Sequence, residues 1–152
     1  MNAGSPAIIE NVFQAMQDVE LKAIPVVRPT YDDSSLEQLQ AIVSENGRGC
    51  LLRITPQTLN TPAIIDSVIE ALSVSPDEVD LLLDYRQNAM LLPNHVPTIP
   101  HLADWHLFIA ASGVFPGSLA SLPLHQWHEL PRHDFSSWQT GVKARLKRKP
   151  IY

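Results

Sequence analysis

The sequence Val79-Asp80-Leu81-Leu82-Leu83-Asp84 decides the fold class of this protein. It is a short apolar run, too short for an ordinary helix and typical of a buried β-strand. Cys50-Leu51-Leu52-Arg53-Ile54 has the same character, and so does the stretch 105–112. Because these runs lack a clean alternation of apolar and polar residues, we expect both faces of the strands to be buried.

Helical patterns separate these strands. Apolar residues recur at steps of three and four over 8–19, 36–43 and 64–72, which predicts three amphipathic helices. Residues 23–27 form another short run rich in β-branched residues, and we expect a strand there that ends at Arg28-Pro29. Strands that alternate with helices predict an α/β fold with a parallel sheet.

The strands follow one another about every 25–30 residues, close to one βα unit of a TIM barrel. A complete barrel takes roughly 200–250 residues, whereas this chain has 152. The sequence therefore predicts half of a TIM-barrel-like fold or an open parallel sheet, in a single α/β domain over 1–152. The open edges of such a sheet favour self-association, or pairing with a missing N-terminal half.

The alternation of predicted strands and helices is less regular towards the C-terminus. Four interruptions by proline and asparagine make any helix within 87–104 short and broken. Residues 125–130 predict a short fifth extended segment. Apolar residues at helical spacing over 135–146 predict a closing helix.

Composition and charge narrow the class of protein. The hydrophobic share is 45% and the charged share 18%, as in ordinary globular domains. We expect no membrane-spanning helix and no signal peptide, because no long apolar run is present. The single cysteine, Cys50, excludes an internal disulfide and is expected to be a buried small hydrophobe. A reducing, cytoplasmic location fits it.

The charges are unevenly distributed. Five of the 11 basic residues lie within 143–149, and all 16 acidic residues precede them. An acidic body disfavours nucleic acid as a partner, except through this basic tail. The tail's cations also suit the C-terminal end of a helix, which is the alternative interpretation.

Five stretches of the chain carry a family resemblance: 24–29 (IPVVRP), 47–54 (GRGCLLRI), 79–86 (VDLLLDYR), 105–116 (WHLFIAASGVFP) and 130–138 (LPRHDFSSW). In this order they resemble the C-terminal part of the phage "beta protein" family, which has phage, prophage and bacterial members. The similarity runs from about residue 20 to the end of the chain. Members are typically about twice as long, so the resemblance implies a truncated version of a longer architecture, acting as a binding or interaction protein.

Polar residues recur at the carboxyl ends of the predicted strands, where parallel α/β folds bind ligands. These candidate ligand-binding residues are Arg28, Arg53, Asp84, Arg86, Ser112 and Arg132. Guanidinium groups match phosphate and carboxylate oxygens, so the pattern predicts a pocket for an anionic small molecule or protein partner. Alternatively, ion pairs tie the strand ends together. Arg53 lies in an apolar strand and needs a carboxylate partner, for which Asp84 is the natural candidate.

Two classes of function remain open. The chain is a binding or interaction protein, or it is an enzyme (or a degenerate remnant of one) acting on a phosphorylated or otherwise anionic substrate at the arginine-lined strand ends. An enzyme needs a general base beside the anion clamp, and Asp84 and Glu129 are the candidates.

Other motifs are weak. The spacing in His125-x-x-His128-Glu129 superficially fits a metal site, but Pro123 and Pro131 bracket the segment, so we expect neither a metal nor another cofactor. Gly47-Arg48-Gly49 is too short for a phosphate loop and predicts the end of a helix. The tryptophans, Trp105, Trp127 and Trp138, are expected to be core or interface anchors.

Overall fold

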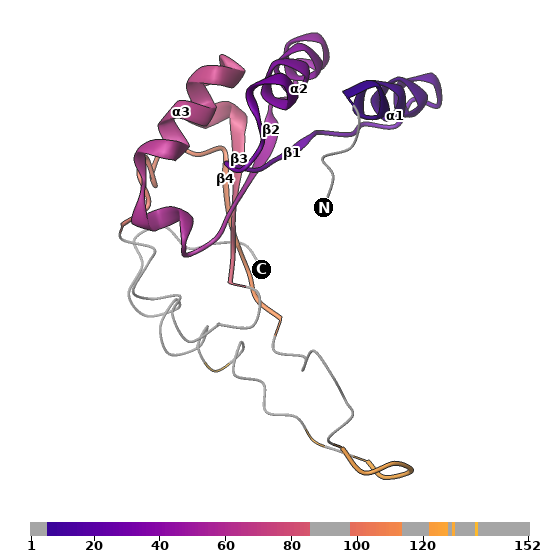
Figure 1. Cartoon of the computed structure of the whole chain (residues 1–152), viewed down its shortest axis with the longest axis vertical. Coiled ribbons are helices and arrows are strands. Elements are labelled where there is room, and N and C mark those ends of the chain that lie inside the picture. The colour runs from indigo at the N-terminus through magenta and orange to yellow at the C-terminus, as the bar shows by residue number, and fades with distance from the viewer. Residues whose placement is uncertain (1–5, 86–97, 114–121, 128, 130–135, 137–152) are drawn as a thin grey trace.

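A computed structural model describes residues 6–85, 98–113, 122–127, 129 and 136 (Figure 1). The elements are α1 (Pro6–Asp18), β1 (Val26–Val27), α2 (Asp33–Asn46), β2 (Cys50–Ile54), η1 (Thr58–Asn60), α3 (Ala63–Leu72), η2 (Pro76–Glu78), β3 (Val79–Asp84) and β4 (Leu107–Ala111). The order of helices and strands predicted up to the fourth strand is confirmed.

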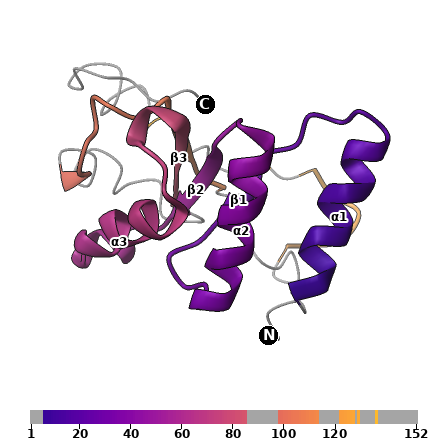
Figure 2. The same ribbon diagram turned by 90° about the horizontal axis from the view of Figure 1, so that it is seen from above.

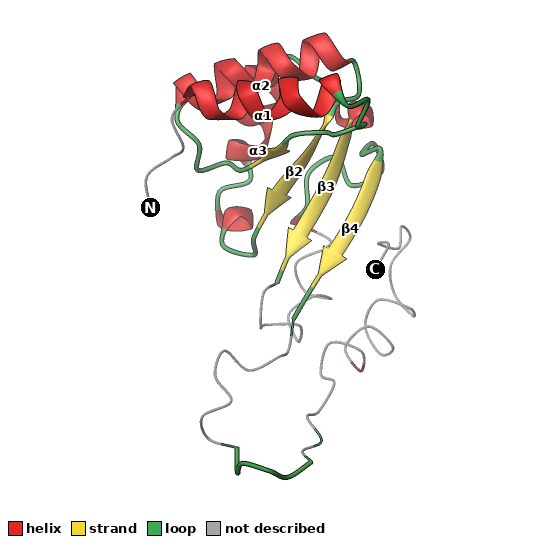
Figure 3. Cartoon of the chain, turned by 90° about the vertical axis from the view of Figure 1, so that its right-hand side faces the viewer, coloured by secondary structure: helices red, strands yellow, loops and turns green. Residues whose placement is uncertain are grey.

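The four strands form one open parallel sheet in the order β1-β2-β3-β4. Their carboxyl ends therefore meet at one edge, to which the arrows of β2, β3 and β4 point in Figure 3. We call it the carboxyl edge. Sequential strand order, with the helices on one face, is the winding of a (β/α) barrel. The predicted α/β class is confirmed, in its open-sheet form.

Capping residues determine where helix α2 begins and ends. The Asp32 side chain accepts a 2.8 Å hydrogen bond from the Ser35 N–H and so caps the first turn. Gly47 ends the helix in the left-handed conformation, with φ of 59°, as predicted for a C-terminal cap. Between these ends the helix buries Leu36, Leu39 and Val43 against the sheet.

Gly49 is required by a close approach between two turns. Its φ is +69°, and a Cβ atom at this position would lie 1.7 Å from the Glu78 carbonyl oxygen. Only glycine allows the turn before β2 to reach the turn before β3. The two amino ends are thereby brought level, and Cys50 pairs with Val79 in the sheet register.

Side chains of the sheet alternate between two environments. On the first face, towards the helices, the register aligns one row of fully buried residues: Val27, Leu52, Leu81 and Phe108. A second row follows with Ile54, Leu83 and Ala110. These rows and the apolar sides of α2 and α3 form the core. The core explains why short leucine-rich runs fold here as strands.

The expectation that both faces are buried is wrong. The intervening residues of β2, β3 and β4 are only half-buried, except for Asp84. In the described part of the chain, α2 and α3 pack side by side over one face alone (Figure 2). The second face carries Arg53, Asp80 and Asp84 among its apolar residues, because these charged groups retain contact with water there.

Strand β1 is shorter than the predicted 23–27. Pro25 and Pro29 bracket its two residues, and proline cannot donate to a strand ladder. This edge therefore offers few backbone groups to another chain. Self-association of the open sheet stays a prediction.

The segment before β4 is anchored by side chains. Trp105 and Ile99 are buried in the core, and the Trp105 Nε1–H donates a 2.9 Å hydrogen bond to the Pro100 carbonyl oxygen. The predicted strand from residue 105 begins two residues later, at Leu107. Trp105 is thus a core anchor, as expected.

The fifth extended segment is not seen in its described part. Residues 124–126 form a turn and bend, and His125 has a φ of 63°. Leu124 and Trp127 are exposed there. The predicted helix over 135–146, with Trp138, and the basic tail 143–149 lie outside the described residues, apart from Ser136. No helix in the described ranges has the length and apolar character needed to cross a membrane.

Candidate functional site

Four of the predicted ligand-binding residues lie at the carboxyl edge. Arg28 follows β1, Arg53 lies near the end of β2, Asp84 ends β3 and Ser112 follows β4. Arg86 and Arg132 lie outside the described residues, so their place in the site stays a prediction. Glu129 is described and exposed.

Arg53 and Asp84 form an ion pair, as the sequence predicted. The Arg53 Nε–H donates a 2.9 Å hydrogen bond to Asp84 Oδ2, and Nη2 donates to the same oxygen. The Arg53 side chain is 33% exposed and that of Asp84 11% exposed. The pair thus satisfies a nearly buried carboxylate while the guanidinium keeps contact with solvent.

The sheet register explains this pairing. Arg53 lies opposite Leu82 in the ladder, and Asp84 is two residues further along β3, on the same face. A long arginine side chain reaches such a diagonal neighbour on the adjacent strand. The chain therefore needs no loop to bring the two charges together.

Arg28 follows β1, the strand next to that of Arg53. It comes one residue after Val27, and Val27 pairs with Leu52, so Arg28 and Arg53 occupy equivalent positions on adjacent strands. Val27 faces the core and β1 ends there, so Arg28 stands directly after the strand at the carboxyl edge. Its side chain is exposed, and it makes no ion pair with another described residue.

Asp32 is close to Arg28 in the sequence, but its carboxylate caps a helix. Asp32 caps α2 through Ser35, and hydrogen bonds from the Ser35 hydroxyl and backbone N–H lower the pKa of Asp32. Its charge is therefore directed at the helix end, where the dipole favours it.

Thr55 and Thr58 were missed by the sequence reasoning. They follow β2 at the carboxyl edge, where the Thr58 hydroxyl accepts a 3.2 Å hydrogen bond from the Thr55 N–H. The two hydroxyl oxygens are 3.4 Å apart. The Thr-Pro-Gln-Thr turn directly after the Arg53 strand was the available signal, since such hydroxyls often accompany arginine at anion sites.

The candidate bases differ in their surroundings. Asp84 already accepts two hydrogen bonds from Arg53 at one oxygen. A carboxylate held in this way can orient the arginine. Its oxygen Oδ2 is already engaged and is therefore poorly placed to accept a proton from a substrate. Glu129 is exposed to solvent, and this exposure lacks the burial that typically marks a general base.

Two histidines make pairs away from this edge. His106 Nδ1 lies 2.7 Å from Asp80 Oδ1 at the amino end of the sheet, and His101 Nε2 lies 3.0 Å from Asp66 Oδ1 on α3. Sequence reasoning placed His106 within a strand and missed both pairs. Among the described residues, no three His, Cys, Asp or Glu side chains gather as a metal site would require.

Cys50 is free and buried, as predicted for a small hydrophobic residue. Burial raises the pKa of its thiol to about 12, and the negative charges of Asp80 and Glu78 add to the effect. The thiolate is therefore scarce at neutral pH, and Cys50 is unsuited to nucleophilic chemistry.

Comparison with known proteins identifies one family. Searches of curated proteins and of solved structures gave no match. The family model described as Beta protein matches residues 2–152, so the similarity also includes α1, which precedes the region where the resemblance had been expected. The chain belongs to the Beta protein family.

Proposed function

We propose that this chain is a binding protein that holds an anionic group, a phosphate or a carboxylate, between Arg28 and Arg53 at the carboxyl edge. The observation that carries the proposal is an exposed arginine directly after β1, the strand that pairs with the strand of a second arginine, Arg53, whose ion pair engages only one side of its guanidinium. Carboxyl edges of parallel sheets are the usual ligand sites of such folds.

The orientation of Arg53 supports this function. Its Nε and Nη2 groups donate to Asp84, whereas Nη1 makes no hydrogen bond to any described residue. Asp84 thus fixes the guanidinium in one orientation. A fixed guanidinium binds an anion with less loss of side-chain entropy than a free one.

The spacing of the two arginines favours an anion as well. Adjacent strands lie about 4.8 Å apart, and like charges at opposite positions destabilise a sheet. An anion between Arg28 and Arg53 removes this repulsion and accepts hydrogen bonds from both. The Thr55 and Thr58 hydroxyls supply further polar groups at the same edge.

The proposal favours binding over catalysis. Asp84 Oδ2 accepts both hydrogen bonds from Arg53, and the pair is best explained as a support for the arginine. We include in the proposal a phage or prophage setting, which the family resemblance supports. A cytoplasmic location is included too, supported by the presence of a single, free cysteine.

The test is a titration of the full chain with inorganic phosphate, followed by amide chemical shifts in NMR. Arg28→Ala should weaken binding about tenfold or more, because charge-assisted hydrogen bonds contribute about 1.5–3 kcal/mol. Arg48→Ala is the matched control, since Arg48 is also exposed but precedes β2 at the amino end. Arg28 is the cleaner probe because removing Arg53 would unpair Asp84.

We expect the shifts to centre on Arg28, Arg53 and Thr55, with the Arg48→Ala variant binding as the wild type does. The proposal is overturned if Arg28→Ala and Arg48→Ala weaken binding equally. It is also overturned if phosphate shifts only the signals of the basic tail.

A further inference from the structure

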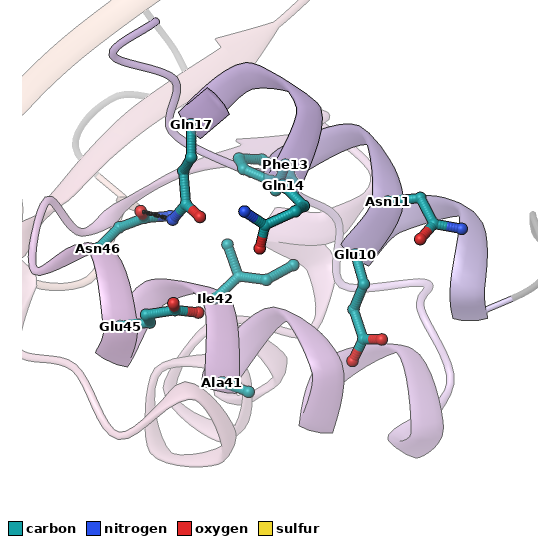
Figure 4. A pocket seen from close by; sticks show the side chains of 9 residues that line it. All are labelled: Glu10, Asn11, Phe13, Gln14, Gln17, Ala41, Ile42, Glu45 and Asn46. Atoms are coloured by element: carbon teal, nitrogen blue, oxygen red, sulfur yellow. Dashed lines mark hydrogen bonds between the residues drawn. The ribbon is translucent and has the colours of Figure 1, made fainter. Parts of the chain in front are cut away.

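The groove between α1 and α2 has a volume of about 290 Å³ and a mostly polar lining (Figure 4). The Gln17 Nε2–H donates a 2.8 Å hydrogen bond to Asn46 Oδ1 across it and so joins the C-terminal turns of the two helices. This groove is explained by helix packing. Within the described chain, the large apolar side chains with the greatest exposure lie elsewhere, at the turn 122–127.

The turn 122–127 presents two large apolar side chains to solvent. Trp127 is 103% exposed and Leu124 is 82% exposed, so no described element covers them. The turn lies beyond the carboxyl edge and away from the sheet in two views at right angles (Figures 1 and 3). Burying a tryptophan removes roughly 150–250 Å² from water. A surface that received this turn would therefore be strongly favoured.

The second face of the sheet is an apolar surface that can receive such a turn. Leu82 and Ile109 are half-buried there and pair side by side in the register, and Leu51 and Leu107 lie one row nearer the amino end. Within the described ranges, helices cover the opposite face alone (Figure 2). Half-buried aliphatic side chains gain from further burial.

Charge complementarity indicates which group accompanies the turn. Glu129 is exposed, follows Trp127 by two residues and makes no ion pair within the described chain. Arg53 lies opposite Leu82 in the ladder, and its Nη1 makes no hydrogen bond to a described residue. Two residues of extended chain span about 6.6 Å, whereas adjacent strands lie about 4.8 Å apart. An indole on Leu82 therefore places the Glu129 carboxylate within reach of Arg53.

A second copy of the chain supplies both surfaces at once. The turn projects away from its own sheet (Figure 3), so it is directed towards another molecule. A second copy can receive the turn on its second face and offer its own turn in return. Such a reciprocal contact is isologous and closes as a two-fold dimer.

We propose that two copies of this chain exchange the turn 122–127, so that Trp127 packs on Leu82 of the second copy. The Glu129 carboxylate then occupies the anion site at the carboxyl edge of that copy. The inference rests on the proposed function, because it names the anion which that site holds. The dimer forms between a turn and a sheet face, and the strand edges stay outside the contact.

The test is sedimentation velocity of the full chain over the micromolar range. The wild type should sediment as a dimer. Trp127→Ala should weaken dimerisation about thirtyfold or more, as expected for a tryptophan at the centre of an interface. Gln126→Ala is the matched control, because Gln126 is an exposed polar residue of the same turn, and it should dimerise as the wild type does.

A charge exchange tests the contact between the two copies. Arg28→Glu and Glu129→Arg should each weaken dimerisation about tenfold or more, because each brings like charges together. The double variant should recover most of the loss. Both positions are exposed, and thermal unfolding of each variant establishes that the chain remains folded.

Two results would overturn the exchange: a wild type that stays monomeric, and a dimer that Trp127→Ala and Glu129→Arg leave intact. Phosphate binding distinguishes this outcome from failure of the anion site. Trp127→Ala should bind phosphate at least as tightly as the wild type, because no second copy competes for the site. A monomeric wild type that binds phosphate would overturn the exchange alone. A dimer formed through the turn, with no phosphate binding by Trp127→Ala, would support the exchange and overturn the phosphate site alone.

Discussion

The two faces of the sheet use the same strands for different purposes. The first face holds complete rows of buried apolar side chains against α2 and α3. The second face is half-buried and carries Arg53, Asp80 and Asp84 among apolar neighbours. The core thus depends on one face, and the polar chemistry of the sheet is concentrated on the other.

This difference shows how a short chain can combine stability with a site. Charged groups on the first face would have to be desolvated fully, at a cost of several kcal/mol each. On the second face, Arg53 keeps a third of its side-chain surface in water and still reaches Asp84. The alternation of a β-strand makes this separation possible with no change in backbone.

The largest effect should come from truncating matched leucines on the two faces. Leu81 is fully buried on the first face, whereas its neighbour Leu82 is half-buried on the second. Leu81→Ala should lower the free energy of unfolding by about 4 kcal/mol, and Leu82→Ala by about 1–2 kcal/mol. Urea denaturation followed by circular dichroism measures both. Equal losses would contradict the distinction between the faces.

An intermediate effect is expected at the ion pair. Asp84→Ala leaves Arg53 without its partner, and we expect a loss of about 2 kcal/mol because the guanidinium is partly solvated. Asp66→Ala is the control, since its pair with His101 is exposed, and it should cost less than about 1 kcal/mol.

The same variant separates a structural from a functional Asp84. If Asp84 supports Arg53, Asp84→Ala should lower the melting temperature and also weaken phosphate binding, because the guanidinium is no longer held in one orientation. An unchanged melting temperature with lost binding would instead make Asp84 part of the binding site itself.

The smallest effect concerns Cys50 on the first face. Its thiol pKa is about 12 in the fold against an ordinary value of 9.0. The folded state therefore holds this proton more tightly, and the free energy of unfolding should fall as the pH rises from 9 towards 12. We expect a loss of about 1 kcal/mol by pH 10, absent in Cys50→Ala.

Thiol labelling gives a second measurement of the same property. At pH 8 the folded chain should react with a disulfide reagent far more slowly than the urea-unfolded chain. Equal rates would show that the thiol is accessible and contradict its assignment to the core.

Sequence reasoning succeeded where the signal is local. The strand over 50–54, the strand over 79–84 and the glycine end of α2 were all predicted, since apolar run length and capping residues act within a few positions. The Arg53–Asp84 pair was also predicted, because a charge within an apolar strand demands a partner and the next strand offered one.

It failed where a distant element decides the environment. Leu81 and Leu82 are identical in type, and only the packing of α2 and α3 over one face distinguishes them. The α1–α2 groove and the Thr55–Thr58 pair were likewise missed, because their members come together through helix packing or turn geometry.

The sequence by itself determined the α/β class, the parallel winding and most of the element boundaries, because these depend on local periodicity and on proline and glycine positions. The tertiary structure alone decided which face is covered and that the strand before Arg28 pairs with the strand of Arg53. It also decided that two acidic helices line one groove. These features depend on strand register and helix packing, in which residues far apart in the chain contribute to a single surface.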